Sequence, residues 1–243
     1  MKYKLPKNKW TDKQVEEHWD KVAHKYVKEN NKVKYAHDQR FRKMLELFPP
    51  LPSGAKILNI TSRDAEASIF LQRTYPGIRV INAEISQGLM NEAFRLWPDI
   101  EQIKISTYSS LPFVDEEFDA IVSLETLEHV AEPVAFLKEL HRVIRPSGIL
   151  ILSCPPATSE FPYRIFTFLF GGHGEGPHRF LPSKKVKMLL KDTGWQVLHH
   201  EGTLLIPAGP VFLQKLGDFL IRKFQHSIIR ELGIRQFYVG KRI

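Results

Sequence analysis

The feature of this sequence that most constrains its fold is a regular alternation of short apolar runs with segments of helical spacing. The apolar runs are rich in Ile and Val and read AKILNI, IRVINAE, FDAIVSL and GILILSC. The segments between them, such as EPVAFLKELHRVI, repeat apolar residues at helical intervals. Near-continuous apolar strands that alternate with helices are typical of an α/β fold, in which a parallel sheet is covered on both faces.

The rest of the chain adds elements to this core. IEQIKIS, WQVLHHEGTLLI and RQFYVGKRI predict further strands, which brings the number of predicted strands to seven. Helices are predicted over 11–27 and 35–48, and Thr11 with Gln14 forms a capping-box pattern at the start of the first. A longer amphipathic helix is predicted over about 211–232.

The length of 243 residues is enough for one large domain or two small ones, and the absence of repeats and low-complexity linkers favours one. We expect a single domain over 1–243, with an N-terminal helical cap over 1–50 and a core over 54–156. A loop-rich insertion over 157–182 and a C-terminal part over 183–243 complete it.

Charge and cysteine content limit the environment. The net charge is +8, and it is concentrated at the two ends: 1–45 holds 13 Lys and Arg against 6 Asp and Glu, and 211–243 holds 7 against 2. Such ends suit nucleic acid, anionic lipid or a phosphorylated substrate, or they are a solvated lysine-rich surface. One cysteine, Cys154, fits a reducing compartment, so a cytoplasmic location is expected. No apolar run approaches the ~18 residues of a transmembrane helix.

Candidate ligand-binding residues follow the predicted strands, because an open parallel sheet binds ligands beyond the carboxyl ends of its strands. The loop after the first strand reads NITSRDA and contains no glycine. Glu84 ends the second strand about twenty residues on, where a carboxylate is placed to accept the hydroxyls of a ribose.

The stretch SSLPFVDEEFDAIVSLETLEHVAEPVAFLKELHRVIRPSGILILSCPP, over about 109–156, resembles the class I S-adenosylmethionine-dependent methyltransferases. The branch it resembles most includes the ubiquinone-biosynthesis O-methyltransferases, and HWDKVAHKY, VINAEIS and FYVGKR also fit that family. The resemblance implies a Rossmann-like seven-stranded sheet whose last strand is antiparallel, and S-adenosyl-L-methionine as the cofactor. The cofactor-binding residues that we predict are Asn59, Thr61, Ser62, Arg63, Asp64, Glu84, Ile85, Thr107, Tyr108 and Leu124.

The first loop departs from the family pattern. Asn59 stands in place of an acidic residue, and the alternating glycines of the family are replaced by Thr61, Arg63 and Ala65. Thr107 stands where the family often has an aspartate that contacts the adenine amino group. One interpretation is that Ser62, Asp64 and backbone amides replace the glycine loop, with Arg63 directed to solvent or to the methionine carboxylate. The other is a decayed loop that binds no cofactor.

The predicted catalytic residues are Glu125, Glu128 and His129, which spell E-x-x-E-H after the fourth strand. Methyl transfer from a sulfonium mainly requires alignment of the acceptor and exclusion of water, and a base helps where the acceptor is a hydroxyl. His129 is the predicted base. Two carboxylates and an imidazole could also hold a divalent metal ion, completed by His173 or His178. The resemblance implies that in many relatives these residues line the cofactor floor without a metal.

Two later segments bear on the acceptor. The loop over 171–180 predicts an acceptor site that includes Tyr163, His173 and His178, and the aromatic residues before the loop either line that site or cover the core under a long connection. In the helix predicted over 211–232, an apolar stripe could pack on the domain or on a second subunit, or could lie on a membrane. The stripe consists of Leu213, Leu216, Leu220, Phe224 and Ile228.

The sequence therefore favours a methyltransferase that acts on oxygen in a small-molecule, lipid-linked or glycan acceptor. A second hypothesis is a non-catalytic member that keeps the fold for binding or scaffolding. A third is an RNA-directed methyltransferase, which the basic N-terminus and the E-x-x-E-H motif suggest but which lacks a recognisable RNA-binding module.

Overall fold

The computed structural model describes residues 10–32, 34–161, 163–164, 179–207 and 209–243. The strands are β1 (Lys56–Ile60), β2 (Arg79–Glu84), β3 (Glu101–Lys104), β4 (Phe118–Leu124), β5 (Ile144–Cys154), β6 (Trp195–Thr203) and β7 (Arg235–Arg242). The α-helices are α1 (Asp12–Lys32), α2 (Lys34–Leu47), α3 (Glu66–Thr74), α4 (Gln87–Leu96), α5 (Pro133–Val143), α7 (Ser183–Asp192) and α8 (Val211–Lys223). Two 3₁₀ turns, η1 (Ala157–Ser159) and η2 (Ile228–Leu232), join them.

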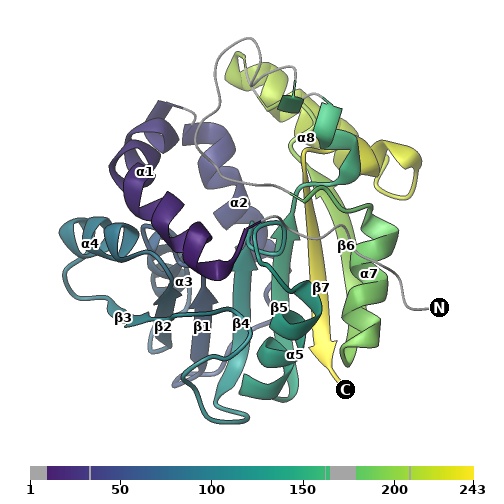
Figure 1. Ribbon diagram of the computed structural model, residues 1–243. Coiled ribbons are helices and arrows are strands. Elements are labelled where there is room, and N and C mark those ends of the chain that lie inside the picture. Colours follow the sequence, from purple (N-terminus) through teal and green to yellow (C-terminus); the bar gives the residue numbers. More distant parts are fainter. Residues whose placement is uncertain (1–9, 33, 162, 165–178, 208) are drawn as a thin grey trace.

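All of these strands belong to one sheet in the order β3-β2-β1-β4-β5-β7-β6 (Figure 1). Strands β1 to β5 pair in parallel, and β7 runs antiparallel to both of its neighbours, β5 and β6. The predicted Rossmann-like sheet with an antiparallel last strand is therefore confirmed. The strand order reverses between β1 and β4, so the carboxyl ends of these two strands flank the crevice where such folds bind ligands.

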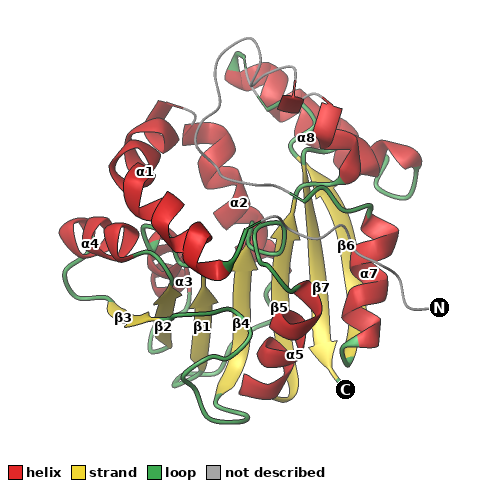
Figure 2. Cartoon of the chain, viewed as in Figure 1, coloured by secondary structure: helices red, strands yellow, loops and turns green. Residues whose placement is uncertain are grey.

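Helices cover both faces of the sheet, as Figure 2 shows. Along β4, Ile121 points into a core shared with α1, α4, α5 and α7, while Ala120 and Val122 point into a second core with α2 and α3. Because successive side chains of a strand face opposite ways, a strand buried on both faces must be apolar at nearly every position. This explains why these strands read as unbroken apolar runs.

Helix α1 lies over the carboxyl edge of the sheet (Figure 1). Its capping box is confirmed: the Thr11 amide donates to Gln14 Oε1 at 2.9 Å, and the Gln14 amide donates to Thr11 Oγ1 at 3.3 Å. Asp20 then accepts hydrogen bonds from Ser86 Oγ at 2.6 Å and from the Gly88 amide at 2.9 Å. These contacts fix α1 against the start of α4, next to the end of β2.

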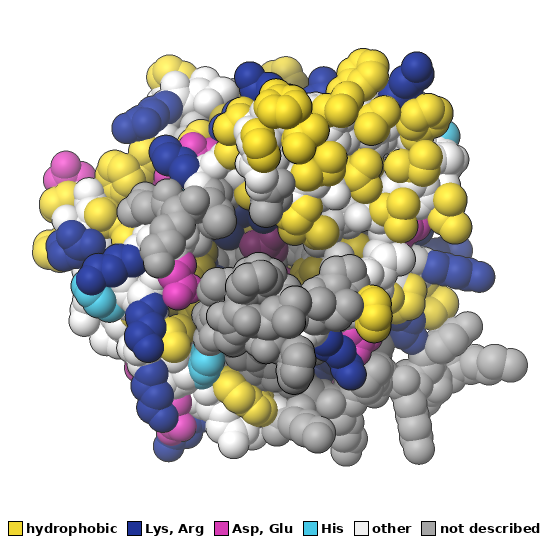
Figure 3. Space-filling view, turned by 90° about the horizontal axis from the view of Figure 1, so that it is seen from above, with side chains coloured by type: hydrophobic (Ala, Val, Ile, Leu, Met, Phe, Trp, Pro, Cys, Tyr) yellow, Lys and Arg dark blue, Asp and Glu magenta, His cyan; other side chains and the backbone are white. Residues whose placement is uncertain are grey.

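The predicted helix over 211–232 is shorter than expected. Helix α8 ends at Lys223, and η2 follows after a turn. Of the alternatives for its apolar stripe, packing on the domain is wrong for Leu216, Phe224 and Ile228, which are exposed. Figure 3 looks down on this end of the molecule and shows a patch of hydrophobic side chains on its surface. None of the described helices has both the length and the apolar character needed to cross a bilayer.

Candidate functional site

The loop between β1 and α3 has an unusual backbone. Thr61, Arg63 and Ala65 adopt left-handed conformations with φ of 56°, 54° and 59°. These are the three positions at which the family that the sequence resembles has glycine. A non-glycine residue in this region costs about 1–2 kcal/mol, and a β-branched residue such as Thr61 is rarer still. The loop therefore keeps a glycine-type bend without glycine.

Hydrogen bonds to neighbouring segments hold this bend in place. The Ser62 amide donates to the Ala83 carbonyl at 3.1 Å, which extends the pairing of β1 with β2. The Ala65 amide donates to the Ser62 carbonyl at 2.7 Å, and Ser68 Oγ donates to the Ala65 carbonyl at 2.6 Å. Left-handed residues persist where the surroundings over-determine them, and such sites are often functional.

Glu84 ends β2 and is fully buried. Its Oε2 accepts the Arg63 amide at 2.7 Å, and its Oε1 accepts the amides of Ile85 at 2.9 Å and Ser86 at 3.0 Å. Burial raises the pKa of this carboxyl above its usual value, and the Arg63 charge opposes that shift. A carboxylate offers about four acceptor positions, so one position on Oε2 remains for a ligand hydroxyl.

The Arg63 side chain does not point to solvent, which corrects one of the predictions for this residue. It is 7% exposed, and its guanidinium carbon lies 3.7 Å from the centroid of the Trp19 ring on α1. Arg63 Nη2 donates to the Glu125 carbonyl at 3.2 Å, whereas the buried Nη1 has no partner among the described residues. The guanidinium thus spans from the β1 loop to the end of β4, directly under α1.

Thr107 and Tyr108 meet the first residue of α1. Thr107 Oγ1 donates to Asp12 Oδ2 at 2.6 Å, and the Tyr108 amide donates to the same oxygen at 3.0 Å. Asp12 Oδ1 is buried and has no partner in the described part of the chain. A carboxylate therefore lies beside Thr107, which stands where the family often has an aspartate. Asp12 of α1 supplies this carboxylate. The Tyr108 ring is part of the core and packs edge-on to Phe136, with centroids 5.9 Å apart.

The remaining predicted cofactor residues divide into two groups. Ser62, Asp64, Ile85 and Leu124 lie buried at the carboxyl edge, and Ser62 Oγ has no partner among the described residues. Asn59 does not reach this edge, because its Nδ2 donates to Asn82 Oδ1 at 2.8 Å across the β1–β2 pair. It therefore stabilises the sheet below the loop.

Glu125, which directly follows β4, is held by two arginines. Arg40 Nη1 of α2 donates to its Oε2 at 3.1 Å, and Arg235 Nε of β7 donates to its Oε1. Although burial acts to raise it, these two charges lower the pKa of Glu125 to about 2. Both oxygens are occupied by guanidinium groups, so the predicted catalytic and metal-binding roles of Glu125 are not supported.

Glu128 and His129 are buried and follow Glu125 closely in the sequence. The three side chains do not come together as a set of metal ligands. The His129 ring lies edge-on to Trp19, with centroids 5.8 Å apart, and is therefore near the same aromatic ring as Arg63. The Glu128 carbonyl accepts the Arg179 amide at 3.1 Å. The E-x-x-E-H motif thus does not form the predicted metal site in the described part of the chain.

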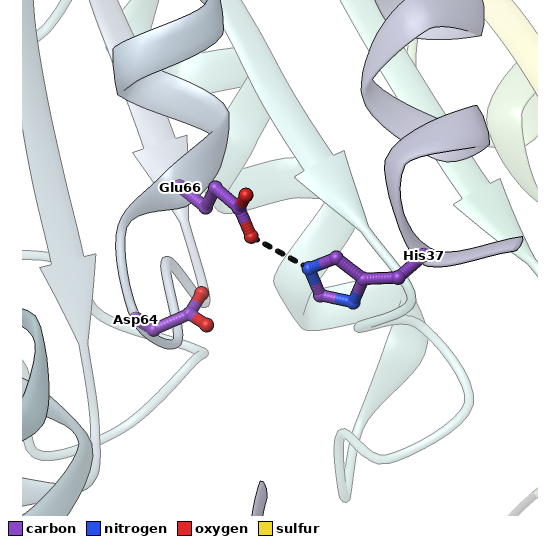
Figure 4. A group of neighbouring side chains, drawn as sticks. All are labelled: His37, Asp64 and Glu66. Atoms are coloured by element: carbon purple, nitrogen blue, oxygen red, sulfur yellow. Dashed lines mark hydrogen bonds and ion pairs between the residues drawn. The ribbon is translucent and has the colours of Figure 1, made fainter. Parts of the chain in front are cut away.

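A different set of potential ligands lies beside the loop: His37 on α2, Asp64 and Glu66 (Figure 4). Arg40 Nη2 lies 3.1 Å from His37 Nδ1, and His37 Nε2 lies 2.7 Å from Glu66 Oε2. An arginine can only donate, so Nδ1 is the acceptor and Nε2 carries the proton that is given to Glu66. That proton lies where a metal ion would have to bind His37, and we interpret His37 as a neutral imidazole that bridges α2 to Glu66 of α3.

This bridge predicts acid-sensitive stability. Burial and the Arg40 charge lower the pKa of His37 to about 3, below the unfolded value of 6.5. Between these values the unfolded chain binds the extra proton, so the free energy of unfolding falls as pH falls from 6.5 towards 3, by about 1.4 kcal/mol per pH unit. Urea unfolding of native protein and His37→Gln across this range measures the effect.

The free energy of unfolding of His37→Gln should depend less steeply on pH, because the variant takes up about one proton fewer on unfolding. It should retain the parallel contribution of His200, whose pKa is also lowered by burial, to about 4. Equal slopes for the two proteins would contradict the neutral bridge.

The predicted acceptor residues are described only in part. His173 and His178 lie outside the described residues. Tyr163 is half-buried and its ring packs on Phe180, with centroids 5.5 Å apart. Arg179, next to Phe180, donates to the Val130 carbonyl at 3.1 Å. The chain after the insertion therefore returns directly over the loop that follows β4.

Sequence reasoning missed three residues at this edge: Asp12, Trp19 and Arg40. Trp19 belongs to the hydrophobic core and also stacks on Arg63. Asp12 is the first residue of α1 and lies within the capping box of Thr11 and Gln14, and this position could have marked it as fixed. Nothing in the local sequence indicated that Arg40 would reach the end of β4.

Comparisons with known proteins find similarity to methyltransferases. Residues 62–152 match the family model described as a methyltransferase domain. The ubiquinone/menaquinone biosynthesis C-methyltransferase of Desulfotalea psychrophila is 25% identical over 161 residues, which cover 65% of this chain and 65% of that protein. The demethylmenaquinone methyltransferase of Staphylococcus saprophyticus is 28% identical over 167 residues, which cover 65% of this chain and 71% of that protein. The match to the first relative thus spans less than two thirds of its length.

Solved structures share the fold over almost the whole chain. A Thermotoga maritima S-adenosylmethionine-dependent methyltransferase superposes with a TM-score of 0.69 at 16% identity, covering 93% of this chain and 99% of that one. The [4+2]-cyclase SpnF gives a TM-score of 0.71 at 16% identity and covers 99% of both chains. In fold and in sequence, this chain is thus similar to the class I S-adenosylmethionine-dependent methyltransferases.

Proposed function

We propose that this chain binds S-adenosylmethionine at the carboxyl edge of β1, β2 and β4 and transfers a methyl group to a small-molecule or lipid-linked acceptor. The observation that carries the proposal is the bend after β1. It has left-handed backbone at Thr61, Arg63 and Ala65 and lies against the buried carboxylate of Glu84. The backbone conformation for which the family uses glycine is therefore present, although the side chains differ.

Unpartnered polar atoms at this edge fit a nucleoside that carries an amino-acid tail. Buried polar groups are normally hydrogen-bonded, yet Ser62 Oγ, Arg63 Nη1 and Asp12 Oδ1 have no partner among the described residues. The free position on Glu84 Oε2 suits a ribose hydroxyl, and Asp12 Oδ1 suits the adenine amino group. Arg63 Nη1 suits the methionine carboxylate, since guanidinium groups pair well with carboxylates.

The bound cofactor would supply an electrophilic methyl group on its sulfonium. The task of the protein is then to position the acceptor and to exclude water. Helix α1 covers the edge, and Trp19 is almost fully buried there. The His129 imidazole follows β4 beside Trp19, and we assign it the role of accepting the proton of an acceptor hydroxyl.

The acceptor that we propose is an apolar ring that carries a hydroxyl group. The two relatives described above are named for methylation in menaquinone or ubiquinone biosynthesis, one of them as a C-methyltransferase. Loss of the proton from a ring hydroxyl makes its oxygen and the neighbouring ring carbons nucleophilic. One base near the cofactor would thus serve transfer to carbon as well as the transfer to oxygen that the sequence resemblance implied.

One observation favours a second function, in which the fold binds no cofactor. The Arg63 guanidinium itself fills the space between Trp19 and the Glu125 carbonyl. A shared fold also does not fix the reaction, as the similarity to a [4+2]-cyclase illustrates.

Calorimetry distinguishes these functions with two ligands: S-adenosylmethionine, and 5′-methylthioadenosine, which lacks the carboxylate. We expect native protein to bind both. Arg63→Ala should lower the affinity for S-adenosylmethionine by about tenfold or more and leave the affinity for 5′-methylthioadenosine nearly unchanged. The matched control is Arg95→Ala, because Arg95 is exposed on α4 and pairs only with Glu92 among the described contacts. Binding that is absent from native protein and appears in Arg63→Ala would identify Arg63 as a plug, and binding by neither would support the second function.

A further inference from the structure

Helix α8 is oriented opposite to an ordinary surface helix. Its buried residues are Gln214, Gly217 and Ile221, so that a polar and a glycine residue face the protein. A Cβ atom at Gly217 would lie 3.0 Å from the Ile206 backbone nitrogen, so a larger residue there would push the helix away from Ile206. Gln214 Nε2 donates to the Gly209 carbonyl at 2.8 Å. These contacts and the buried Ile221 fix the rotation of the helix, which leaves Phe212, Leu216 and Phe219 facing outward.

The outward face of α8 combines apolar and cationic side chains. Phe212 is 68% exposed and Phe219 is 58% exposed. Three cations, Lys215, Arg222 and Lys223, are exposed on the same helix. The single carboxylate of α8, Asp218, instead accepts a hydrogen bond from Tyr35 of α2 at 3.1 Å.

The apolar surface continues beyond the helix. The exposed large hydrophobic residues between 211 and 232 are Val211, Phe212, Leu216, Phe219, Phe224, Ile228 and Leu232. We call these seven residues, with Lys215, Arg222 and Lys223, the α8 face. Figure 3, which looks onto this end of the molecule, shows hydrophobic side chains gathered in a patch with Lys and Arg side chains at its margin. Exposed patches of this kind mark interaction sites.

We propose that the α8 face docks on the surface of an anionic lipid bilayer. Aromatic and aliphatic side chains flanked by Lys and Arg, with no free carboxylate on the helix, are the composition of a helix that lies in a membrane interface. A second copy of the chain fits less well. A two-fold contact would place this face against itself, and the three cations would meet like charges with no carboxylate of α8 to balance them.

The location of this surface connects it to the proposed reaction. In Figure 1, α8 lies at the end of the sheet to which the carboxyl ends of β1 to β5 point, and α1 lies at the same end. A bilayer at the α8 face would therefore be on the same side of the molecule as the cofactor edge. The link to a lipid-linked acceptor rests on the proposed function, whereas binding to the bilayer does not.

Vesicle flotation tests the proposal with phosphatidylcholine vesicles that contain or lack phosphatidylglycerol. We expect native protein to float with the anionic vesicles and to be released as ionic strength rises. Phe212→Ser with Phe219→Ser should reduce binding about tenfold or more, and Lys215→Gln with Arg222→Gln and Lys223→Gln should abolish the preference for anionic vesicles.

The matched controls lie elsewhere on the surface. Phe94→Ser, at a residue 59% exposed on α4, should float as native protein does. So should the triple variant Lys21→Gln, Arg73→Gln and Lys138→Gln, because these cations are exposed on other helices. No flotation of native protein, or equal loss in the controls, would overturn the proposal, as would a dimer in light scattering that the Phe212 and Phe219 changes dissociate. Calorimetry with S-adenosylmethionine on the same variants keeps failure of membrane binding distinct from failure of the proposed function.

Discussion

Replacing Glu84 with alanine will lower the affinity for S-adenosylmethionine by about 100-fold or more and will also destabilise the fold. The carboxylate accepts three backbone amides in a site closed to water. Without it these donors lose their acceptor, at about 1 kcal/mol each. The same change removes the proposed ribose contact and releases the Arg63 amide, so the bend after β1 loses a support. Each 1.4 kcal/mol lost in binding is a tenfold loss of affinity.

Two measurements separate these effects. Calorimetry gives the affinity of native protein and Glu84→Ala, and urea unfolding with and without the cofactor gives the stability of each and the stabilisation by ligand. Glu101→Ala is the control. Glu101 starts the neighbouring strand, and among the described contacts its carboxylate pairs with the exposed Arg79. An unchanged affinity in a destabilised Glu84→Ala protein would show that Glu84 supports the bend and does not bind the ribose.

Glu125→Ala will have the largest effect on stability that we expect from a single side chain. The side chains of Arg40 and Arg235 are each only 9% exposed, and both donate to the Glu125 carboxylate. Removing that carboxylate leaves two buried guanidinium groups without their counter-ion. Breaking a fully buried ion pair in this way costs about 3–5 kcal/mol, and the Glu125 side chain is 26% exposed, so we expect a loss near the lower end of that range. The matched surface pair is Arg79 with Glu101, whose side chains are 60% and 38% exposed, and there Glu101→Ala should cost less than about 1 kcal/mol.

Urea unfolding near neutral pH tests this comparison. The pKa of Glu125 is lowered to about 2 in the folded protein, so its contribution is complete above the unfolded value near 4.5 and is lost as pH falls from there towards 2. Native protein should therefore approach the stability of Glu125→Ala in strong acid. Similar losses for Glu125→Ala and Glu101→Ala at neutral pH would show that water still screens the Glu125 cluster.

The fold could be predicted from the sequence because its signals are local. A strand buried on both faces must be apolar at almost every position, and the runs at β1, β2, β4 and β5 met that condition. The capping box at Thr11 was equally local. Helix α8 was harder to predict, since its periodic stripe shows which side of the helix is apolar but not which side meets the protein. Close packing at Gly217 decided that orientation.

The site was only partly predictable because its contacts join distant segments. The position of Glu84 follows from strand length, and the sequence located it correctly at the end of β2. The stacking of Arg63 on Trp19 and the ion pairs of Glu125 depend on where α1, α2 and β7 meet the loops. The spacing of the E-x-x-E-H motif does not contain that information. Glu125 was therefore predicted to be catalytic, whereas the structure places it in an ion-pair cluster.

The left-handed residues after β1 also bear on the order in which this protein can fold. A glycine loop can sample its bend in the isolated chain, whereas Thr61, Arg63 and Ala65 oppose it there. Their conformation depends on the Ala83 carbonyl and the Glu84 carboxylate, which are in reach only once β2 has paired with β1. The bend after β1 thus forms after this part of the sheet, and a chain arrested before that pairing would lack the bend.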